Sequence, residues 1–168
     1  MSDYYIGLGS NLGNRAELMG RAVQALARTA GIHVARMSSL YETPPWGKTD
    51  QPPFLNAVVK VTTAWGPQRL LKQCLAIEQS LGRQRHEKWG SRTIDLDLLF
   101  SPDWTVSEPD MNLPHPYLTE RAFVLVPLAE IAPHLKINDV AIAVYLERLQ
   151  SEAAHITSVG PIIFPEVD

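Results

Sequence analysis

The order in which hydrophobic periodicity changes along this chain limits its fold more than any single motif does. Strands place alternate side chains on opposite faces, whereas helices repeat their faces about every 3.6 residues. On this basis the sequence predicts strands at 4–8, 32–41, 54–63 and 94–100, and helices at 15–30 and 67–81. The order of elements is therefore strand, helix, strand, strand, helix, strand.

This order is the split βαβ pattern, and it predicts an α+β fold, a ferredoxin-like α/β sandwich with a mainly antiparallel sheet. Thirteen prolines, concentrated at 44–67 and 102–133, predict long ordered loops, which are candidates for catalytic loops. Further elements are expected as a short strand at 105–107 and helices at 120–131 and 140–150. For the C-terminal extension at 155–168 an added edge strand, another ordered extension and disorder all stay open.

Composition sets broad limits on the class of protein. With 168 residues, 45% hydrophobic and 20% charged, the chain can bury one ordinary core, and we expect a single domain over 1–168. A formal net charge of −3 argues against a general nucleic-acid binder. Cys74 is the only cysteine, which excludes an internal disulfide and fits a reducing cytoplasm. Without a basic leader or a membrane-length apolar run, we predict a cytoplasmic protein that does not contact membranes.

The strand at 94–100 carries two aspartates on the face opposite to its apolar residues. Ile94, Leu96 and Leu98 share one face, while Asp95 and Asp97 share the other. The two carboxylates then lie roughly 7 Å apart on one rigid surface. Aspartate is disfavoured in strands, and binding a hard cation such as Mg²⁺ is one reason to place two of them there. Taken alone, the pair fits a solvated strand face equally well.

A cationic run leads directly into this strand. Arg83, Arg85, Lys88 and Arg92 fall within ten residues. Cations bind phosphate oxygens, and carboxylates bind the Mg²⁺ that bridges those oxygens, so the run and the aspartates together predict a metal-bound polyphosphate. For the run alone, the alternative is a charged surface loop.

Two further polar residues stand out. Glu78 falls within the apolar stripe of the helix at 67–81, either as an acceptor for a donor on a bound base or sugar, or as a glutamate at the rim of the stripe that reaches water. His115 lies between two prolines and shortly before Arg121, so it is a candidate phosphate contact. The alternative for a lone histidine is a structural hydrogen bond, and a zinc site is not expected.

The glycine-rich turn after the first strand resembles a phosphate-binding turn only at first sight. Its glycines, Gly7, Gly9 and Gly13, have neither the dinucleotide-binding spacing nor the lysine of a P-loop. We therefore interpret them as residues that allow close packing and tight turning. Asn11 or Asn14 is expected to cap the following helix.

Five motifs in order make the chain resemble the 6-hydroxymethyl-7,8-dihydropterin pyrophosphokinases, over a span from Tyr5 to about Pro133. The motifs are Gly9-Ser10-Asn11-Leu12, Tyr41-Glu42-Thr43-Pro44-Pro45, Phe54-Leu55-Asn56-Ala57, Trp89-Gly90-Ser91-Arg92-Thr93-Ile94-Asp95-Leu96-Asp97, and Pro114-His115 with Arg121-Ala122-Phe123. The resemblance implies a folate-pathway enzyme that transfers pyrophosphate from ATP to 6-hydroxymethyl-7,8-dihydropterin and releases AMP.

The resemblance also implies residue roles. Asp95 and Asp97 would hold two Mg²⁺ ions and, with Arg83 and Arg92, form the catalytic set. The ATP contacts would be Glu78, Arg85, Trp89, Arg92, Ile94, His115 and Arg121. The pterin contacts would be Thr43, Pro44, Trp46, Phe54, Asn56 and Phe123. In that set, Phe54 and Phe123 would sandwich the ring and Asn56 would read its polar edge; without the resemblance, core packing would explain both phenylalanines.

The chain departs from the commonest family pattern at three places. Ser91 stands where many members have proline, and Trp46 replaces a smaller apolar residue. The loop at 85–89 is shorter, which leaves the role of Lys88 open.

The expected partners are the two small-molecule substrates, without nucleic acid or membrane, and the expected state is a monomer. A glycosidase would need carboxylates on opposite sides of a sugar bond, and a nucleic-acid module would need basic strands. A non-catalytic nucleotide sensor is the third alternative.

Overall fold

The structure is a computed structural model, and it describes residues 1–44, 52–82 and 94–165. Within these ranges six strands form one sheet in the order β10-β3-β4-β1-β5, with β2 also paired to β4, and all pairs are antiparallel. The strands are β1 (Ser2–Ser10), β2 (Ile32–Met37), β3 (Ser39–Thr43), β4 (Phe54–Thr63), β5 (Asp95–Phe100) and β10 (Thr157–Pro161). The predicted antiparallel α+β sandwich is confirmed.

The segment at 32–41, expected as one strand, is divided into β2 and β3 at Ser38. The backbone N–H of Ser38 donates to the carbonyl of Val58 at 2.9 Å, and the N–H of Val58 donates to the Ser38 hydroxyl at 2.9 Å. One side chain thus replaces a ladder bond and allows the strand to change direction. The expectation of a single strand was wrong, because this break depends on a partner in another strand.

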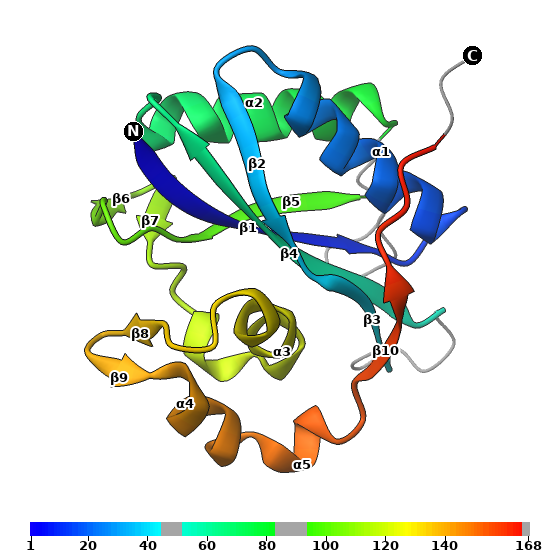
Figure 1. The fold of residues 1–168 in the computed structure, drawn as a ribbon, viewed down its shortest axis with the longest axis vertical. Coiled ribbons are helices and arrows are strands. Elements are labelled where there is room, and N and C mark those ends of the chain that lie inside the picture. Colours follow the sequence, from blue (N-terminus) through cyan, green and yellow to red (C-terminus); the bar gives the residue numbers. More distant parts are fainter. Residues whose placement is uncertain (45–51, 83–93, 166–168) are drawn as a thin grey trace.

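Two helices cover one face of the sheet, α1 (Arg15–Arg28) and α2 (Pro67–Ser80) (Figure 1). Asn14 caps α1, with its side-chain oxygen accepting from the N–H of Glu17 at 3.2 Å, while Pro67 opens α2. The larger core lies between these helices and the sheet. Among its fully buried members are Tyr4, Ile6, Met19, Leu26, Leu70, Ile94 and Leu96.

The opposite face is also covered, which the sequence did not indicate. It carries α3 (Ala122–Ile131), preceded by a 3-10 turn at Leu118–Glu120, and then α4 (Ile142–Arg148), α5 (Gln150–Ala153) and the hairpin of β8 (Lys136–Ile137) and β9 (Val140–Ala141). Leu125 and Leu128 of α3 pack with Tyr5, Val58 and Leu99 in a second core. The helix expected at 140–150 is divided at Leu149.

The short strand expected at 105–107 is β6 (Val106–Glu108), which pairs with β7 (Met111–Leu113) as a separate hairpin. The extension at 155–168 contributes β10, so the edge-strand alternative holds: β10 pairs with β3, and the chain then runs along α1 (Figure 1). There Gln24 Nε2 donates to the carbonyl of Pro165 at 3.4 Å, and a Cβ on Gly20 would overlap the carbonyl of Ile163.

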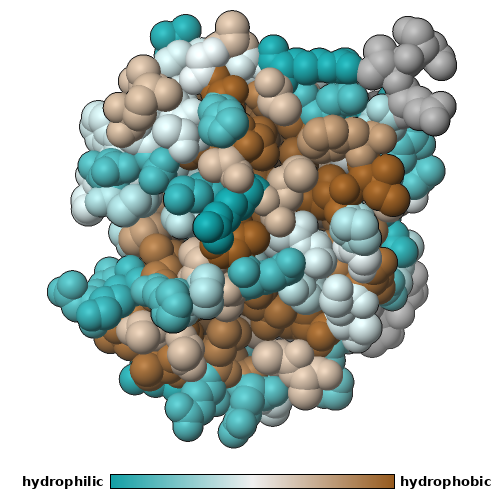
Figure 2. All heavy atoms as spheres, viewed as in Figure 1, coloured by the Kyte–Doolittle hydropathy of each residue, from teal (hydrophilic) through white to brown (hydrophobic). Residues whose placement is uncertain are grey.

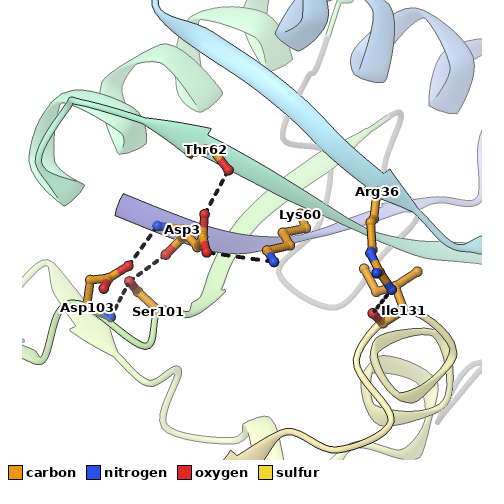
Figure 3. Close-up of polar contacts among 7 residues, drawn as sticks. All are labelled: Asp3, Arg36, Lys60, Thr62, Ser101, Asp103 and Ile131. Atoms are coloured by element: carbon orange, nitrogen blue, oxygen red, sulfur yellow. Dashed lines mark hydrogen bonds and ion pairs between the residues drawn. The ribbon is translucent and has the colours of Figure 1, made fainter. Parts of the chain in front are cut away.

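A polar network fixes the end of the sheet farthest from the two aspartates (Figure 3). Asp3 of β1 accepts from the Thr62 hydroxyl at 2.7 Å and lies 3.7 Å from Lys60 Nζ, both on β4. Its backbone N–H donates to Asp103 at 2.8 Å, and its carbonyl accepts from the Ser101 hydroxyl at 2.6 Å. The turn after β5 is therefore tied directly to β1, and through Asp3 it is linked to β4.

On the face seen in Figure 2, hydrophobic residues form patches between hydrophilic ones. Among the residues that the structure describes, no helix is long and apolar enough to cross a bilayer.

Candidate active site

The two aspartates lie on the sheet face that carries α3. Ile94, Leu96 and Leu98 are at most 5% exposed in the core on the other face, whereas Asp97 is exposed and Asp95 is half-buried. The predicted alternation along β5 is confirmed. In the strand register Asp95 is opposite Gly9, and Gly9 is opposite Asn56 on β4; Asp97 is opposite Gly7 in the next row. The acids and Asn56 thus stand on either side of β1 on one surface.

The glycines of β1 keep the surface between these side chains low. A Cβ on Gly9 would lie 3.0 Å from Asn56 Nδ2, and a Cβ on Gly7 would lie 3.1 Å from Leu99 Cδ1. The Asn56 amide therefore lies close over Gly9, which only a residue without a side chain permits easily. The prediction that these glycines allow close packing is confirmed at Gly9. Their location in the floor of the site was not foreseen, because it depends on the register of three strands.

Thr43 fixes the orientation of the Asn56 amide. The Thr43 hydroxyl donates to Asn56 Oδ1 at 3.3 Å, and both side chains are almost fully buried. Thr43 is also opposite Phe54 in the register of β3 and β4, and Phe54 is half-buried. Three of the predicted pterin contacts are therefore brought together at this end of the sheet.

A cavity of about 560 Å³ opens beside this group. Its walls come from the end of β3, from the start of α3 and from the segment around α5. It is lined by Thr43, Pro44, Glu120, Arg121, Ala122, Phe123, Ser151, Glu152, His155 and Ile156. The cavity joins four predicted site residues, Thr43, Pro44, Arg121 and Phe123. Sequence reasoning missed the residues of 151–156, which carry no motif and reach the cavity only through the path of the chain.

His115 and Arg121 belong to one cluster at the rim of the site. The backbone N–H of His115 donates to the carbonyl of Leu99 at the end of β5, at 2.8 Å. His115 Nδ1 accepts from the N–H of Tyr117 at 3.2 Å, and Arg121 Cζ lies 5.2 Å and 5.8 Å from the rings of Tyr117 and Phe123. Burial, and secondarily the charge of Arg121, lowers the pKa of His115 below its usual value of 6.5. We therefore describe His115 as a neutral imidazole at neutral pH.

Glu78 and Ile94 lie behind the site and within the core. Glu78 is 3% exposed, and its Oε2 accepts from the backbone N–H of Leu96 at 2.7 Å. The alternative of a glutamate at the rim that reaches water was wrong. The Ile94 side chain is fully buried, which leaves its backbone for any contact with ATP. Cys74 is next to Glu78 on α2, and burial, then Glu78 and Asp97, raise the pKa of its thiol to about 12.

Two side chains after β1 hold the far end of the proline-rich segment that follows β3. Asn11 Nδ2 donates to the carbonyl of Pro52 at 3.3 Å, and Arg15 Nη1 donates to the carbonyl of Pro53 at 2.6 Å. Of the two candidate helix caps, Asn14 is therefore the cap, and Asn11 has a different contact. The sequence offered no signal for either bond. Trp46, Arg83, Arg85, Lys88, Trp89 and Arg92 lie outside the described residues, and their roles stay predictions.

The aspartates fit the chemistry of magnesium. Mg²⁺ in phosphoryl-transfer sites is usually bound through one or two carboxylates together with substrate phosphates, and Asp95 and Asp97 supply two carboxylates on an open surface. In the described parts of the chain, no group of three or more His, Cys, Asp or Glu side chains is placed to hold a metal. The pair, rather than a closed cage, is the candidate metal centre.

Comparison with known proteins bears on the family to which this chain belongs. The family model described as 7,8-dihydro-6-hydroxymethylpterin-pyrophosphokinase (HPPK) matches residues 5–133. The 2-amino-4-hydroxy-6-hydroxymethyldihydropteridine pyrophosphokinase of Methylorubrum extorquens is 50% identical over 149 residues, which cover 89% of this chain and 94% of the relative. The protein of that name from Bacillus subtilis is 43% identical over 132 residues, 79% of each chain.

A solved structure agrees at the level of the fold. The crystal structure of Plasmodium falciparum HPPK-DHPS with pteroate superimposes with a TM-score of 0.73 at 17% identity. The match covers 94% of this chain but 46% of that longer one, so the chain spans about half the length of the structure that it matches. With the family model and the sequence relatives, these findings show that the chain belongs to the 7,8-dihydro-6-hydroxymethylpterin-pyrophosphokinase family.

Proposed function

We propose that this chain transfers the pyrophosphoryl group of ATP to 6-hydroxymethyl-7,8-dihydropterin, with AMP as the second product, on the open sheet surface beside β5. Membership of the family makes it an ATP-dependent pyrophosphokinase of folate biosynthesis. The observation that carries the location is the row of Asp95, Gly9 and Asn56. This row places candidate metal ligands and a candidate pterin-reading amide on opposite sides of a glycine floor.

Asp95 and Asp97 are assigned to two Mg²⁺ ions that accompany the triphosphate. When bound, Mg²⁺ would polarise the phosphate and ease deprotonation of the pterin hydroxyl. The contribution of the chain is to hold two carboxylates roughly 7 Å apart on a strand whose other face is locked into the core. Because the core holds this strand on its other face, the backbone that carries both carboxylates is in place before the substrates bind.

Phe54, Asn56 and Phe123 are assigned to the pterin, together with Thr43 and Pro44. Aromatic faces on both sides of a flat ring supply affinity, and an amide, which is both donor and acceptor, suits the amino-oxo edge. The Thr43 bond to Asn56 Oδ1 supports this assignment because it holds the amide in one orientation before the ring arrives.

His115 and Arg121 are assigned to the phosphates. Since His115 Nδ1 accepts from the N–H of Tyr117, the neutral ring carries its proton on Nε2 and can donate it to a phosphate oxygen. Arg121 adds a fixed positive charge. The predicted roles of Arg83 and Arg92 in catalysis, and of Glu78, Arg85, Trp89 and Ile94 at ATP, are retained as parts of the proposal.

The segments at 44–53 and around Trp89 are expected to close over the reactants and exclude water, with ATP binding before the pterin. The bonds from Asn11 and Arg15 to Pro52 and Pro53 support this by fixing one end of the first segment. Trp46 belongs to this segment as a pterin contact. The cytoplasmic location, the monomeric state and the absence of nucleic-acid or membrane partners stay predictions.

A coupled assay for AMP tests the function. The protein is incubated with ATP, Mg²⁺ and 6-hydroxymethyl-7,8-dihydropterin, and AMP should form only when all three are present. AMP formation that does not depend on the pterin would contradict pyrophosphoryl transfer. ATP binding without AMP formation would identify the nucleotide sensor instead.

A further inference from the structure

Two of the three walls of the cavity come from β3 and α3, and one carboxylate joins these two elements. Thr43 and Pro44 are at the end of β3, whereas Arg121 and Phe123 are at the start of α3. Glu130 lies at the other end of α3 and contacts β3. Together with Ser39 and Tyr41 it forms a group that we call the Glu130 clasp.

Three hydrogen bonds make up the Glu130 clasp. Glu130 Oε1 accepts from the backbone N–H of Ser39 at 2.9 Å and from the Tyr41 hydroxyl at 2.6 Å, and Oε2 accepts from the Ser39 hydroxyl at 3.0 Å. Burial, and then the Glu130 carboxylate, raise the pKa of Tyr41 to about 12, so its hydroxyl keeps the proton that it donates. Hydrogen bonds to a charged acceptor are the stronger class of such bonds.

A second bond holds the same end of α3. Arg36 Nη1 of β2 donates to the carbonyl of Ile131, the last residue of α3, at 3.2 Å (Figure 3). The carboxyl end of this helix is therefore tied to both β2 and β3. Its amino end carries Arg121 and Phe123 to the cavity, so any tilt about the tied end changes the width of the cavity.

We propose that Glu130 is a positioning residue for the pterin, because it sets the spacing between Phe123 on α3 and Thr43 on β3. A helix rises about 1.5 Å per residue, which places Phe123 roughly 10 Å along the axis from Glu130. A tilt of about 5° would then move Phe123 by about 1 Å, a displacement large enough to impair an active site. The proposal rests on the pterin site proposed above.

Kinetics of Glu130 variants test it, with KM for each substrate measured separately. Glu130→Ala should raise the KM for the pterin about fivefold or more, the effect of about one net hydrogen bond. The KM for ATP should rise less, because its contact Arg121 moves with the same end of α3 but carries its charge on a long side chain that can adjust. Tyr41→Phe, which removes one of the three bonds, should give a smaller increase. Glu130→Gln should recover part of the loss, because its amide oxygen can still accept from Ser39.

The matched control is Glu17→Ala, which removes an exposed helical glutamate that also makes hydrogen bonds, to Asn14 and Arg21 on α1. It should leave both KM values unchanged. An unchanged pterin KM in Glu130→Ala would overturn the proposal, as would equal increases in both KM values accompanied by a lower melting temperature. If the wild-type chain forms no AMP, the proposed function fails instead, so the two failures are distinguishable.

Discussion

The Glu78 carboxylate accepts a hydrogen bond from the backbone N–H of Leu96 across 2.7 Å, and this bond joins α2 to the middle of the aspartate strand. Leu96 lies between Asp95 and Asp97 in sequence, on an edge strand of the sheet. A buried acid on a helix thus satisfies a backbone donor that has no further strand beside it. The position of the candidate metal ligands depends on a residue that lies on the other side of the strand.

Glu78→Ala should destabilise the fold by about 1–3 kcal/mol, because the N–H of Leu96 loses its buried acceptor. Turnover should fall as well, since the same bond holds the strand that carries Asp95 and Asp97. Glu78→Gln keeps an acceptor oxygen, so it should lose less stability and less turnover than Glu78→Ala. Urea unfolding and AMP formation measure the two effects. Unchanged stability would contradict the support that Glu78 gives to the strand, whereas a higher KM for ATP would support its proposed contact with ATP.

Asp97→Asn should lower kcat by about 100-fold or more, because an amide is a far weaker Mg²⁺ ligand than a carboxylate. Asp97 is exposed and its strand is held by the opposite face, so the free energy of unfolding should change by less than about 0.5 kcal/mol. Asp110→Asn, at an exposed turn between β6 and β7, is the control and should be active. Loss of folding without a separable kinetic defect in Asp97→Asn would argue for a structural role.

Gly9→Ala should raise the KM for the pterin more than the KM for ATP. The new Cβ would lie 3.0 Å from Asn56 Nδ2, so the amide must shift away from the orientation that Thr43 holds. Gly66→Ala serves as the comparison, because the nearest atom to its Cβ would be at 3.8 Å. Steady-state kinetics with each substrate varied in turn give the two KM values. Equal KM values in Gly9→Ala and wild type would mean that Asn56 does not read the pterin.

The lowered pKa of His115 makes a pH-dependent contribution to stability. An unfolded histidine has a pKa near 6.5, so as the pH falls through this value the unfolded chain takes up a proton that the folded His115 resists. The folded state should therefore lose stability as the pH falls below about 6.5. The His115→Gln variant should lose less stability over the same pH range than the wild-type protein does. Above that pH the difference between the two proteins should be constant. Urea midpoints across the range measure it, and parallel curves throughout would contradict the prediction.

The aspartate strand could be predicted from sequence because its pattern is local. Alternation from Ile94 to Leu98 depends only on the period of a strand, and the order of elements depends only on neighbours along the chain. The break at Ser38 could not be predicted, because its partner is Val58 in another strand.

The sequence motifs could suggest candidate site residues, but they gave no sign of the contacts that hold those residues in place. Motifs identified Thr43, Asn56 and Phe123, and the structure brings Thr43 into contact with Asn56 and into one cavity with Phe123. The Glu130 clasp joins residues that are about ninety positions apart. A glutamate, a serine and a tyrosine so far apart in sequence give no sign that they form hydrogen bonds. Non-local hydrogen bonds of this kind are decided by packing, which a single sequence does not display.

The strand β10 has a consequence for how copies of this protein meet. A sheet edge with unpaired N–H and C=O groups is a template for a strand from another molecule. By pairing with β3 from Ser39 to Glu42, β10 occupies that template with a segment of the same chain. Its own side chains are mostly exposed, and its register is interrupted between Ser158 and Gly160, which makes the new outer edge a poor template in turn. The C-terminal strand therefore leaves β3 no unpaired edge from Ser39 to Glu42 on which a strand of another copy could pair.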